Sequence, residues 1–420
     1  MLETQDVCVV GLGYIGLPTA SFLATRKSRV YGVDVNPKVV EKLSRGEIHI
    51  YEPDLDVLVK SAVNSGALRV GPEPKPADVF ILAVPTPFQG DHKPDISYVL
   101  SATRSIASCL QHGNLVILES TSPVGTTEKI AELLQELRPD LHIAREGDDS
   151  DAGGDQVYVA HCPERVLPGQ IIKELVDNDR IIGGINPASA QKAQDFYGEF
   201  VNGKILLTNA RTAEMAKLVE NASRDVSIAF ANELSLICDK VDINVWELIG
   251  LANHHPRVNI LQPGPGVGGH CIAVDPWFII DSAPEDAKLI RTAREVNNSK
   301  PHFVVNKTLE AAAAFDRPAV ACLGLSYKAN VDDLRESPPI EIVEELANRD
   351  GIARLLVVEP HVQELPRALQ GLPNVEFTDT DAALEQADVI VLLVDHNAFK
   401  KIDRSRLDGK TVIDTRGIWR

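Results

Sequence analysis

Short continuous apolar runs alternate with helical patterns over the first half of the chain. Four such runs, each bounded by glycine, proline or polar residues, are Val7–Val10, Arg29–Val33, Asp78–Val84 and Asn114–Leu118. Strands that are apolar on both faces and alternate with helices are typical of a parallel, doubly wound sheet. The pattern therefore predicts an α/β domain here. The acidic, glycine-containing residues 145–155 are predicted to form an exposed loop.

The carboxyl-terminal part of the chain repeats this plan. Its apolar runs are Pro318–Leu323, Leu355–Glu359 and Ala387–Val394, and its segment ADVIVLLVDH resembles ADVFILAVPTP of the first half. The residues between the two halves show helical periodicity apart from one glycine-rich stretch. We therefore expect an α/β fold in which two Rossmann-like doubly wound domains, residues 1–208 and 307–420, are joined by a helical central domain, residues 209–306. A long central helix without a sheet of its own often supplies a dimer surface, so we expect a homodimer or higher homo-oligomer.

The charge balance narrows the class of partner. The formal net charge is −18 over 420 residues, whereas nucleic-acid binding needs a basic face. No apolar run approaches the roughly 20 residues that cross a bilayer, and the first six residues lack the features of a signal peptide. We expect a cytoplasmic protein with neither a nucleic-acid nor a membrane partner.

The six cysteines are scattered and include no C-x-x-C pair. This spacing argues against a compact zinc cluster and against a disulfide framework. We therefore expect free thiols and no metal site.

A glycine-rich loop predicts the cofactor. Gly11-Leu-Gly13-Tyr-Ile-Gly16 matches G-x-G-x-x-G, follows a predicted strand, opens a helix, and is followed by Asp34 at the end of the next strand. In this arrangement Gly11 makes the turn, Gly13 admits a pyrophosphate and Gly16 lets the helix pack on the strand. Asp34 would accept hydrogen bonds from a ribose diol and repel a 2′-phosphate, which favours NAD over NADP. The alternative is a glycine turn without a ligand.

The carboxyl-terminal domain keeps only Gly324 at the matching place. Because the rest of the fingerprint is missing there, we expect this domain to bind a different phosphorylated ligand.

A second glycine-rich segment, residues 264–275, contains a candidate nucleophile. Cys271 follows a run of glycines and precedes Asp275 by four residues. Glycines permit close backbone approach to a ligand, so this thiol is expected to be accessible. A free thiol has a pKa near ~8.5 and needs help to ionise; loop amides or Lys217 could supply it, whereas the adjacent His270 is a weaker candidate. The plainer interpretation is a buried structural thiol.

One stripe of the helix predicted over residues 209–239 carries polar side chains. Lys217, Asn221 and Arg224 lie at i, i+4 and i+7, which places them on one face. Most polar stripes are merely solvated, but asparagine is a poor choice for a solvated mid-helix position. An ammonium and an amide one turn apart suit a developing oxyanion.

These motifs, taken together, resemble the UDP-glucose/GDP-mannose dehydrogenase family. The segments that carry the resemblance span nearly the whole chain and include GLGYIGLP, GEIHIYEPDL, AVPTPFQGDHKPD, LESTSPVGTTEK, CPERVLPGQ, RTAEMAKLVENASRDVSIAFANELS, HHPRVNILQPGPGVGGHCIAVDPWF and DDLRESP. The family oxidises the C6 alcohol of a nucleotide sugar to a carboxylate with NAD. It combines an NAD domain, a helical dimerisation core and a UDP-binding domain.

The resemblance also implies roles for individual residues. Cys271 matches the nucleophile, Lys217 and Asn221 the oxyanion partners, Asp275 an aspartate tied to a catalytic water, and Glu164 a glutamate of thioester hydrolysis. Implied cofactor contacts, beside the three glycines, are Tyr14, Ile15, Asp34, Thr86, Thr121, Thr127 and Arg335. Implied substrate contacts, beside Lys217 and Asn221, are Arg165, Val166, Arg224, His255, Arg257, Gly268, Tyr327, Lys328 and Arg416. Arg257 is expected to reach the site of the partner subunit.

The sugar that the resemblance implies is UDP-N-acetyl-D-mannosamine, with UDP-GlcNAc, UDP-glucose and GDP-mannose as alternatives. Enzymes for UDP-glucose often carry a lysine before the aspartate, where this chain has Val274. Two other functions stay open: a two-electron dehydrogenase of a small hydroxy acid, which would not need Cys271, and a non-catalytic NAD sensor.

Overall fold

The computed structural model describes residues 5–26, 28–50, 52–90, 92–147, 156–167, 169–269 and 271–419. Its contacts divide the chain into two compact units. Unit 1 contains the residues up to Val219 together with Trp277–Ser282, and unit 2 contains Glu220–Pro276 and the residues from Ala283 onward. Most of the loop predicted over residues 145–155 lies outside the described residues.

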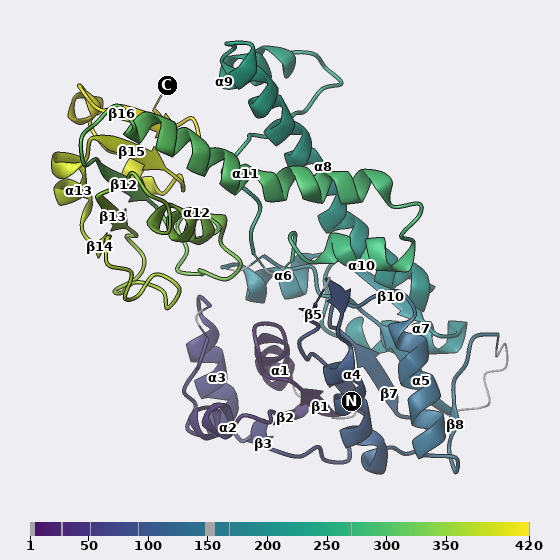
Figure 1. Ribbon diagram of the computed structural model, residues 1–420. Helices are drawn as coiled ribbons and strands as arrows, with labels where there is room; N and C mark the ends of the chain where they lie inside the picture. The colour runs from purple at the N-terminus through teal and green to yellow at the C-terminus, as the bar shows by residue number, and fades with distance from the viewer. Residues whose placement is uncertain are drawn as a thin grey trace. The chain divides into compact units, whose positions relative to one another are not determined.

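Unit 1 is built on one large sheet (Figure 1). The strand order is β11-β10-β9-β7-β4-β1-β2-β3, with β8 paired to β9. The strands are β1 (Asp6–Val10), β2 (Arg29–Val33), β3 (Leu68–Gly71), β4 (Val79–Leu82), β7 (Leu115–Leu118), β8 (His142–Ile143), β9 (Gln156–His161), β10 (Arg180–Gly184) and β11 (Ile205–Asn209). A separate hairpin pairs β5 (Phe88–Gln89) with β6 (Lys93–Pro94).

Helices cover both faces of this sheet. They are α1 (Gly16–Thr25), α2 (Pro37–Ser44), α3 (Leu55–Asn64), α4 (Ser97–Ile106), α5 (Thr126–Leu137), α6 (Ile171–Asp177) and α7 (Pro187–Tyr197), with a 3₁₀ turn, η1, at Ala107–Cys109. Successive strand residues point to opposite faces. Val7 and Val9 accordingly belong to a core shared with α1, α3, α6 and α7, whereas Cys8 and Val10 belong to a core shared with α4 and α5.

The predicted strands and the doubly wound plan are confirmed, with one difference. The pairs from β3 through β9 are parallel, but β10 runs antiparallel to β9. Only Gly183 and Gly184 of β10 pair with β9, at His161 and Ala160, so the contact is short. The connection from β9 to β10 contains the short helix α6 and returns the chain along the same edge in the opposite direction.

Unit 2 contains a second sheet, of order β14-β13-β12-β15-β16, in which all pairs are parallel. Its strands are β12 (Ala319–Leu323), β13 (Arg354–Val358), β14 (Val375–Phe377), β15 (Val389–Leu392) and β16 (Thr411–Asp414). Alternate strand residues again separate into two cores, one shared with α11 and α12 and one with α13 and α14. The helices of this part are α9 (Val245–Ala252), α11 (Lys288–Ala312), α12 (Pro338–Ala347), α13 (Thr380–Gln386) and α14 (Asn397–Lys400), with a 3₁₀ turn, η2, at Arg404–Leu407.

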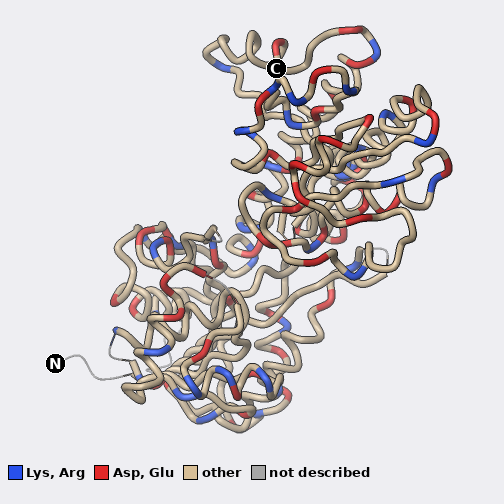
Figure 2. The backbone as a smooth tube through the Cα atoms, turned by 90° about the vertical axis from the view of Figure 1, so that its left-hand side faces the viewer, with Lys and Arg blue, Asp and Glu red and all other residues tan. Residues whose placement is uncertain are grey.

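The central part of the chain is helical, as predicted. Helix α8 (Ala210–Lys240) matches the helix expected over residues 209–239 within a residue at each end, and α10 (Asp275–Ser282) begins at the end of the glycine-rich segment. None of the described helices is long and apolar enough to pass through a bilayer. Figure 2 shows acidic and basic residues interspersed along the chain.

Candidate functional site

The loop after β1 has the backbone that its glycines permit. Gly11 has φ +93°, and its amide donates to Val33 O over 2.8 Å. A Cβ on Gly16 would lie 1.8 Å from Gly11 O, so only glycine allows α1 to start this close to the turn. A Cβ on Gly13, by contrast, would meet nothing within 4 Å. The first and third glycines therefore serve the packing of the loop, whereas the second leaves space above it.

Asp34 closes the same loop from the end of β2. Its Oδ2 accepts from the Leu12 amide at 3.1 Å and its Oδ1 from the Asn36 amide at 2.8 Å. Each carboxylate oxygen has a second lone pair, so Asp34 can still accept from a ribose hydroxyl. Tyr14 is exposed and Ile15 half-buried beside the open face of Gly13. The open space at Gly13, the α1 N-terminus and Asp34 fit a dinucleotide.

Three threonines predicted to contact the cofactor lie in unit 1 in different environments. Thr86 and Thr121 are half-buried, and Thr86 Oγ1 donates to Thr121 O at 2.5 Å. Thr127 is fully buried. Its amide and its hydroxyl both donate to Glu214 Oε1, at 2.8 and 2.6 Å, while the Gly125 amide donates to Oε2 at 2.6 Å. Sequence reasoning missed Glu214, which ties the N-terminus of α5 to α8.

A buried polar cluster lies at the carboxyl ends of β7 and β9. Glu164 Oε1 accepts from the Arg165 amide at 2.7 Å, and Glu164 Oε2 accepts from Arg180 Nη2 at 3.3 Å. The second carboxylate of this cluster is Glu119, which accepts from Tyr197 OH at 2.7 Å. Only Glu164 was predicted from the sequence, because the other members come from segments far apart in the chain.

The remaining predicted residues of unit 1 surround this edge. Arg165 Nη1 donates to Asp179 O at 3.1 Å, and Val166 packs partly buried against the core. Lys217 is half-buried on α8. Burial and, to a smaller extent, the charge of Lys217 together lower the pKa of His161, at the end of β9, to about 3. Lys217 therefore lies near the carboxyl end of β9.

In unit 2 the segment around Cys271 forms a turn that leads into α10. The amides of Val274 and Asp275 both donate to Cys271 O, at 3.0 and 2.9 Å. Cys271 is exposed, whereas the other five cysteines, which also lie in the described residues, are buried or half-buried. Asp275 is buried, and its Oδ2 accepts from Asn221 Nδ2 at 2.5 Å. The structure thus joins the side chains of Asn221 and Asp275, and the Asp275 amide in turn to the backbone of the turn that carries Cys271.

The glycines of this segment allow close packing against residues 327–338. A Cβ on Gly268 would lie 2.2 Å from Glu336 O and 3.1 Å from Tyr327 Cβ. Gly269 has φ +83° and its amide donates to Glu336 O at 3.2 Å. Tyr327, a predicted substrate contact, is thereby placed beside the turn that carries Cys271.

The start of the same segment is fixed by a buried polar chain that sequence reasoning missed. The Gly264 amide donates to Asn232 Oδ1 at 2.9 Å, and Asn232 Nδ2 donates to Asn297 Oδ1 at 2.8 Å. Asn297 Nδ2 reaches Asp225 Oδ1 at 2.8 Å, which also accepts from Arg294 Nη1 at 2.6 Å. These side chains join α8 to α11 and hold the glycine-rich segment to both.

Arg416 also meets this segment. Its Nε and Nη2 donate to Asp395 Oδ1 at 3.1 and 2.9 Å. Its Nη1 occupies the space that a Cβ on Gly264 would need, at 2.5 Å. Asp395 thus holds the Arg416 guanidinium against the segment that leads to Cys271.

The other predicted residues of unit 2 are exposed. Lys328 is exposed, and Arg335 forms a bidentate pair with Asp333 at 2.9 and 2.6 Å. His255 and Arg257 lie in the loop after α9, where the Arg257 amide donates to His255 Nδ1 at 3.3 Å. Arg224 is exposed on α8. His270 lies outside the described residues.

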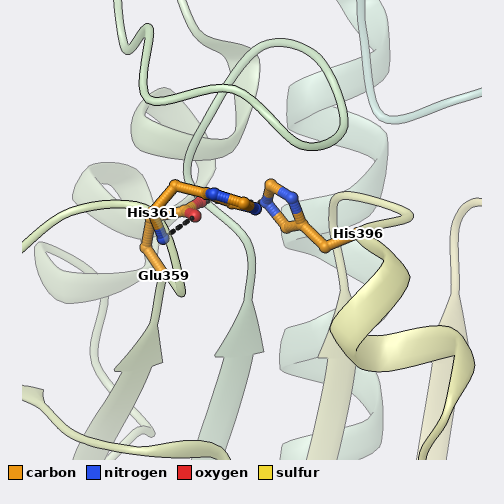
Figure 3. A group of neighbouring side chains, drawn as sticks. All are labelled: Glu359, His361 and His396. Atoms are coloured by element: carbon orange, nitrogen blue, oxygen red, sulfur yellow. Dashed lines mark hydrogen bonds and ion pairs between the residues drawn. The ribbon is translucent and has the colours of Figure 1, made fainter.

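Figure 3 shows a cluster of Glu359, His361 and His396 at the carboxyl end of the second sheet. Glu359 follows β13 as Asp34 follows β2, and its Oε2 accepts from the amides of Leu325 and Ser326 at 2.7 and 3.1 Å. The second sheet thus has a carboxylate, that of Glu359, at the place that Asp34 takes in the first sheet. One of its oxygens, however, already accepts hydrogen bonds from amides of the loop after β12.

The spacing of these three side chains would allow a metal ion, but their hydrogen bonds do not favour one. His396 Nδ1 accepts from the Asn330 amide at 2.9 Å, so the proton of this neutral ring lies on Nε2, which faces Glu359 Oε2 at 3.1 Å. Burial alone would raise the pKa of Glu359, but the bonds from His396 and the Leu325 amide lower it below its ordinary value. We interpret the cluster as a hydrogen-bonded brace of the loop.

The sequence matches one protein family along most of its length. It matches the UDP-glucose/GDP-mannose dehydrogenase family in its NAD binding domain over residues 5–201, its central domain over residues 211–299 and its UDP binding domain over residues 321–420. The chain belongs to this family of NAD-dependent dehydrogenases. NAD is the cofactor of this enzyme.

Three relatives show how similar the chain is to described members. It is 58% identical over its whole length, and over 97% of the relative, to an NDP-N-acetyl-D-galactosaminuronic acid dehydrogenase of Ralstonia nicotianae. It is 55% identical, over all of both chains, to the UDP-N-acetyl-D-mannosamine dehydrogenase of Escherichia coli. Among solved structures, the UDP-D-ManNAc dehydrogenase of Pyrococcus horikoshii superposes with a TM-score of 0.86 at 42% identity, over 99% of this chain and 96% of that one.

Proposed function

We propose that this enzyme oxidises the C6 alcohol of UDP-N-acetyl-D-mannosamine to the carboxylate. The observation that carries the proposal is the exposed Cys271 in a turn that leads to Asp275, whose carboxylate accepts from Asn221 at 2.5 Å. A nucleophile is of no use in a simple alcohol oxidation, but it is needed to take an aldehyde to the level of an acid.

In this mechanism NAD, when bound, accepts the hydride that C6 loses in each of two successive oxidations. Between them the Cys271 thiolate adds to the bound aldehyde and forms a thiohemiacetal. Lys217 and Asn221, one turn apart on α8, would stabilise its oxyanion. After the second oxidation Cys271 carries a thioester, which water cleaves. Asp275 and Glu164 are the groups that we assign to orient this water and to take its proton.

The same proposal assigns binding roles. Tyr14, Ile15, Asp34, Thr86, Thr121 and Arg335 would contact NAD beside the glycine loop, and Thr127 would act through its place at the α5 N-terminus. Arg165, Val166, Arg224, His255, Gly268, Tyr327, Lys328 and Arg416 would contact the nucleotide sugar. Residues 1–208, 209–306 and 307–420 would be the cofactor, central and UDP-sugar domains.

The assembly that we propose is a homodimer formed around α8, in the cytoplasm. Three large apolar side chains of this helix are at least 44% exposed, namely Val219, Phe230 and Ile237. Such a surface is more apolar than a solvated helix face needs to be. The partner subunit's Arg257 would complete the substrate site.

The sugar has a second candidate, because the names of close relatives divide between N-acetyl-D-mannosamine and N-acetyl-D-galactosaminuronic acid derivatives. Both are derivatives of 2-acetamido sugars, which favours such a substrate over UDP-glucose. Val274, which stands where UDP-glucose enzymes often have lysine, is buried.

A panel of nucleotide sugars tests the proposal. NADH production should be faster with UDP-N-acetyl-D-mannosamine than with UDP-N-acetyl-D-galactosamine, UDP-GlcNAc, UDP-glucose or GDP-mannose. Each molecule of nucleotide sugar that is oxidised should yield two molecules of NADH. A faster reaction with UDP-N-acetyl-D-galactosamine would select the second candidate. One NADH per sugar would reject the four-electron reaction.

A further inference from the structure

Glu164 does not act alone in the buried cluster at the carboxyl ends of β7 and β9. We propose that Arg180 and Glu119 are positioning residues for Glu164: Arg180 fixes its carboxylate, and Glu119 competes with Glu164 for the charge of Arg180. This inference rests on the role in thioester hydrolysis proposed above for Glu164.

Arg180 holds one oxygen of Glu164, and the backbone holds the other. The two side chains are only 8% and 7% exposed, and Arg180 Nη2 lies 3.3 Å from Glu164 Oε2. Oε1 accepts from the Arg165 amide at 2.7 Å. With both oxygens engaged, the plane of the carboxylate is fixed, and each oxygen retains a lone pair that can accept a proton from water.

Arg180 is itself held from three other directions. Its Nη1 lies 3.6 Å from Cys162 Sγ, its Nη2 donates to Leu175 O at 3.3 Å, and its guanidinium stacks 4.6 Å above the Tyr197 ring. Burial opposes its charge, but the charge of Glu164 raises the pKa of Arg180 well above its ordinary value. Arg180 is therefore a fixed positive charge whose place does not depend on Glu164 alone.

Glu119 is a second carboxylate near the same guanidinium. It is 1% exposed, and its two oxygens accept from Tyr197 OH at 2.7 Å and Thr19 Oγ1 at 3.2 Å. Burial and, next, the charge of Glu164 raise the pKa of Glu119 to about 7, against the opposing effects of Arg180 and the two hydroxyls. The Cys162 thiol also faces this group, and burial raises its pKa to about 11, so it stays neutral.

One cation and two carboxylates therefore lie buried in one cluster. While Glu119 holds a proton, Glu164 alone balances the charge of Arg180. When Glu119 ionises, the two carboxylates share that one positive charge. Glu164 is then neutralised less completely and accepts the proton of the water more readily.

The step affected is the cleavage of the thioester. Water attacks the thioester carbon, the C–S bond breaks, Cys271 leaves as thiolate, and the proton of the water passes to Glu164. The rate of such a step follows the readiness of the base to accept the proton, and we expect a change of roughly threefold. Ionisation of Glu119 should therefore accelerate hydrolysis and leave the first oxidation unaffected.

The experiment compares the wild type with Glu119→Gln, which imitates the protonated state. Enzyme, NAD and UDP-N-acetyl-D-mannosamine are mixed, the reaction is stopped with acid, and intact-protein mass spectrometry follows the acylated enzyme while absorbance follows NADH. The ratio of wild-type to variant hydrolysis rates should be near unity at pH 6 and rise to roughly threefold at pH 8.5. Glu132→Gln, an exposed glutamate of α5, is the matched control and should show a flat ratio.

Arg180→Lys keeps the charge but loses the planar fork. It should slow hydrolysis about tenfold and the first oxidation much less, so that acylated enzyme accumulates. If this variant does not fold, the pH dependence of the ratio of wild-type to Glu119→Gln hydrolysis rates still tests the proposal.

The inference and the proposed function fail in different ways. The acylated enzyme should accumulate in Glu164→Gln. If no acylated enzyme accumulates in this variant, Glu164 has no role in hydrolysis of the thioester. If Glu164→Gln accumulates the thioester but the ratio of wild type to Glu119→Gln stays flat from pH 6 to 8.5, the role of Glu119 is wrong. Hydrolysis of the thioester at the wild-type rate in Arg180→Lys, with no accumulation of acylated enzyme, would overturn the role of Arg180.

Discussion

Replacement of Asn232 by alanine tests whether the buried polar chain holds the segment that leads to Cys271. Asn232 is fully buried and joins the Gly264 amide to Asn297. The substitution removes both hydrogen bonds and deprives a buried donor and a buried acceptor of these partners. Each orphaned buried group costs about 1–3 kcal/mol, so the free energy of unfolding of unit 2 should fall by about 2–6 kcal/mol.

For a unit of this size each kcal/mol lowers the melting temperature by about 2–4 °C, which predicts a loss of roughly 4–24 °C. Because Gly264 begins the glycine-rich segment, turnover measured well below the melting temperature should fall too. Circular dichroism melting and NADH production measure the two effects. Asn348→Ala, at the exposed end of α12, is the control and should stay within about 0.5 kcal/mol. An Asn232→Ala enzyme with wild-type melting temperature and turnover would refute the assignment.

Three further predictions follow from single contacts. Gly13→Ala should retain wild-type stability and lose affinity for NAD, measured by calorimetric titration. Gly16→Ala should lose about 1–3 kcal/mol or more in stability, since its Cβ would lie 1.8 Å from Gly11 O. Equal stability of the two variants would contradict the roles assigned to these glycines. Glu214→Gln should cost about 1–3 kcal/mol in urea unfolding, because one of the three donors from Gly125 and Thr127 would face an amide NH₂; Glu233→Gln, exposed on α8, is its control. The pKa of Glu119 is raised from 4.5 to about 7 on folding, so the folded state binds the extra proton and this group's contribution to stability is lost as pH rises between those values. Glu119→Gln should therefore gain up to about 3 kcal/mol relative to wild type between pH 4.5 and 8, measured by urea unfolding at each pH; a constant difference would argue against the raised pKa.

Local sequence patterns predicted the parts of the molecule that are built from neighbouring residues. The Gly11–Gly16 loop, Asp34 and α8 could be predicted because each depends on the spacing of residues within one strand, loop or helix. The antiparallel direction of β10 could not, since it depends on the connection after β9 and the pattern of β10 itself is that of any buried strand.

The side-chain networks could not be predicted from the sequence either. Glu119, Arg180 and Tyr197 meet only because the sheet brings β7, β10 and the end of α7 to one edge, and each residue alone reads as an ordinary polar position. The chain from Asn232 to Asp225 depends in the same way on how α8 and α11 cross. Gly268 could be singled out from its motif, but its close approach to Glu336 O required the structure.

The central claim is that Cys271 forms a covalent intermediate on the way to the acid. The most direct test supplies the 6-aldehyde of UDP-N-acetyl-D-mannosamine and NAD to Cys271→Ala and counts the NADH produced, with Cys109→Ala as the control. The account predicts one NADH per aldehyde from the wild type and from Cys109→Ala, and none from Cys271→Ala. Full conversion of the aldehyde by Cys271→Ala would contradict it.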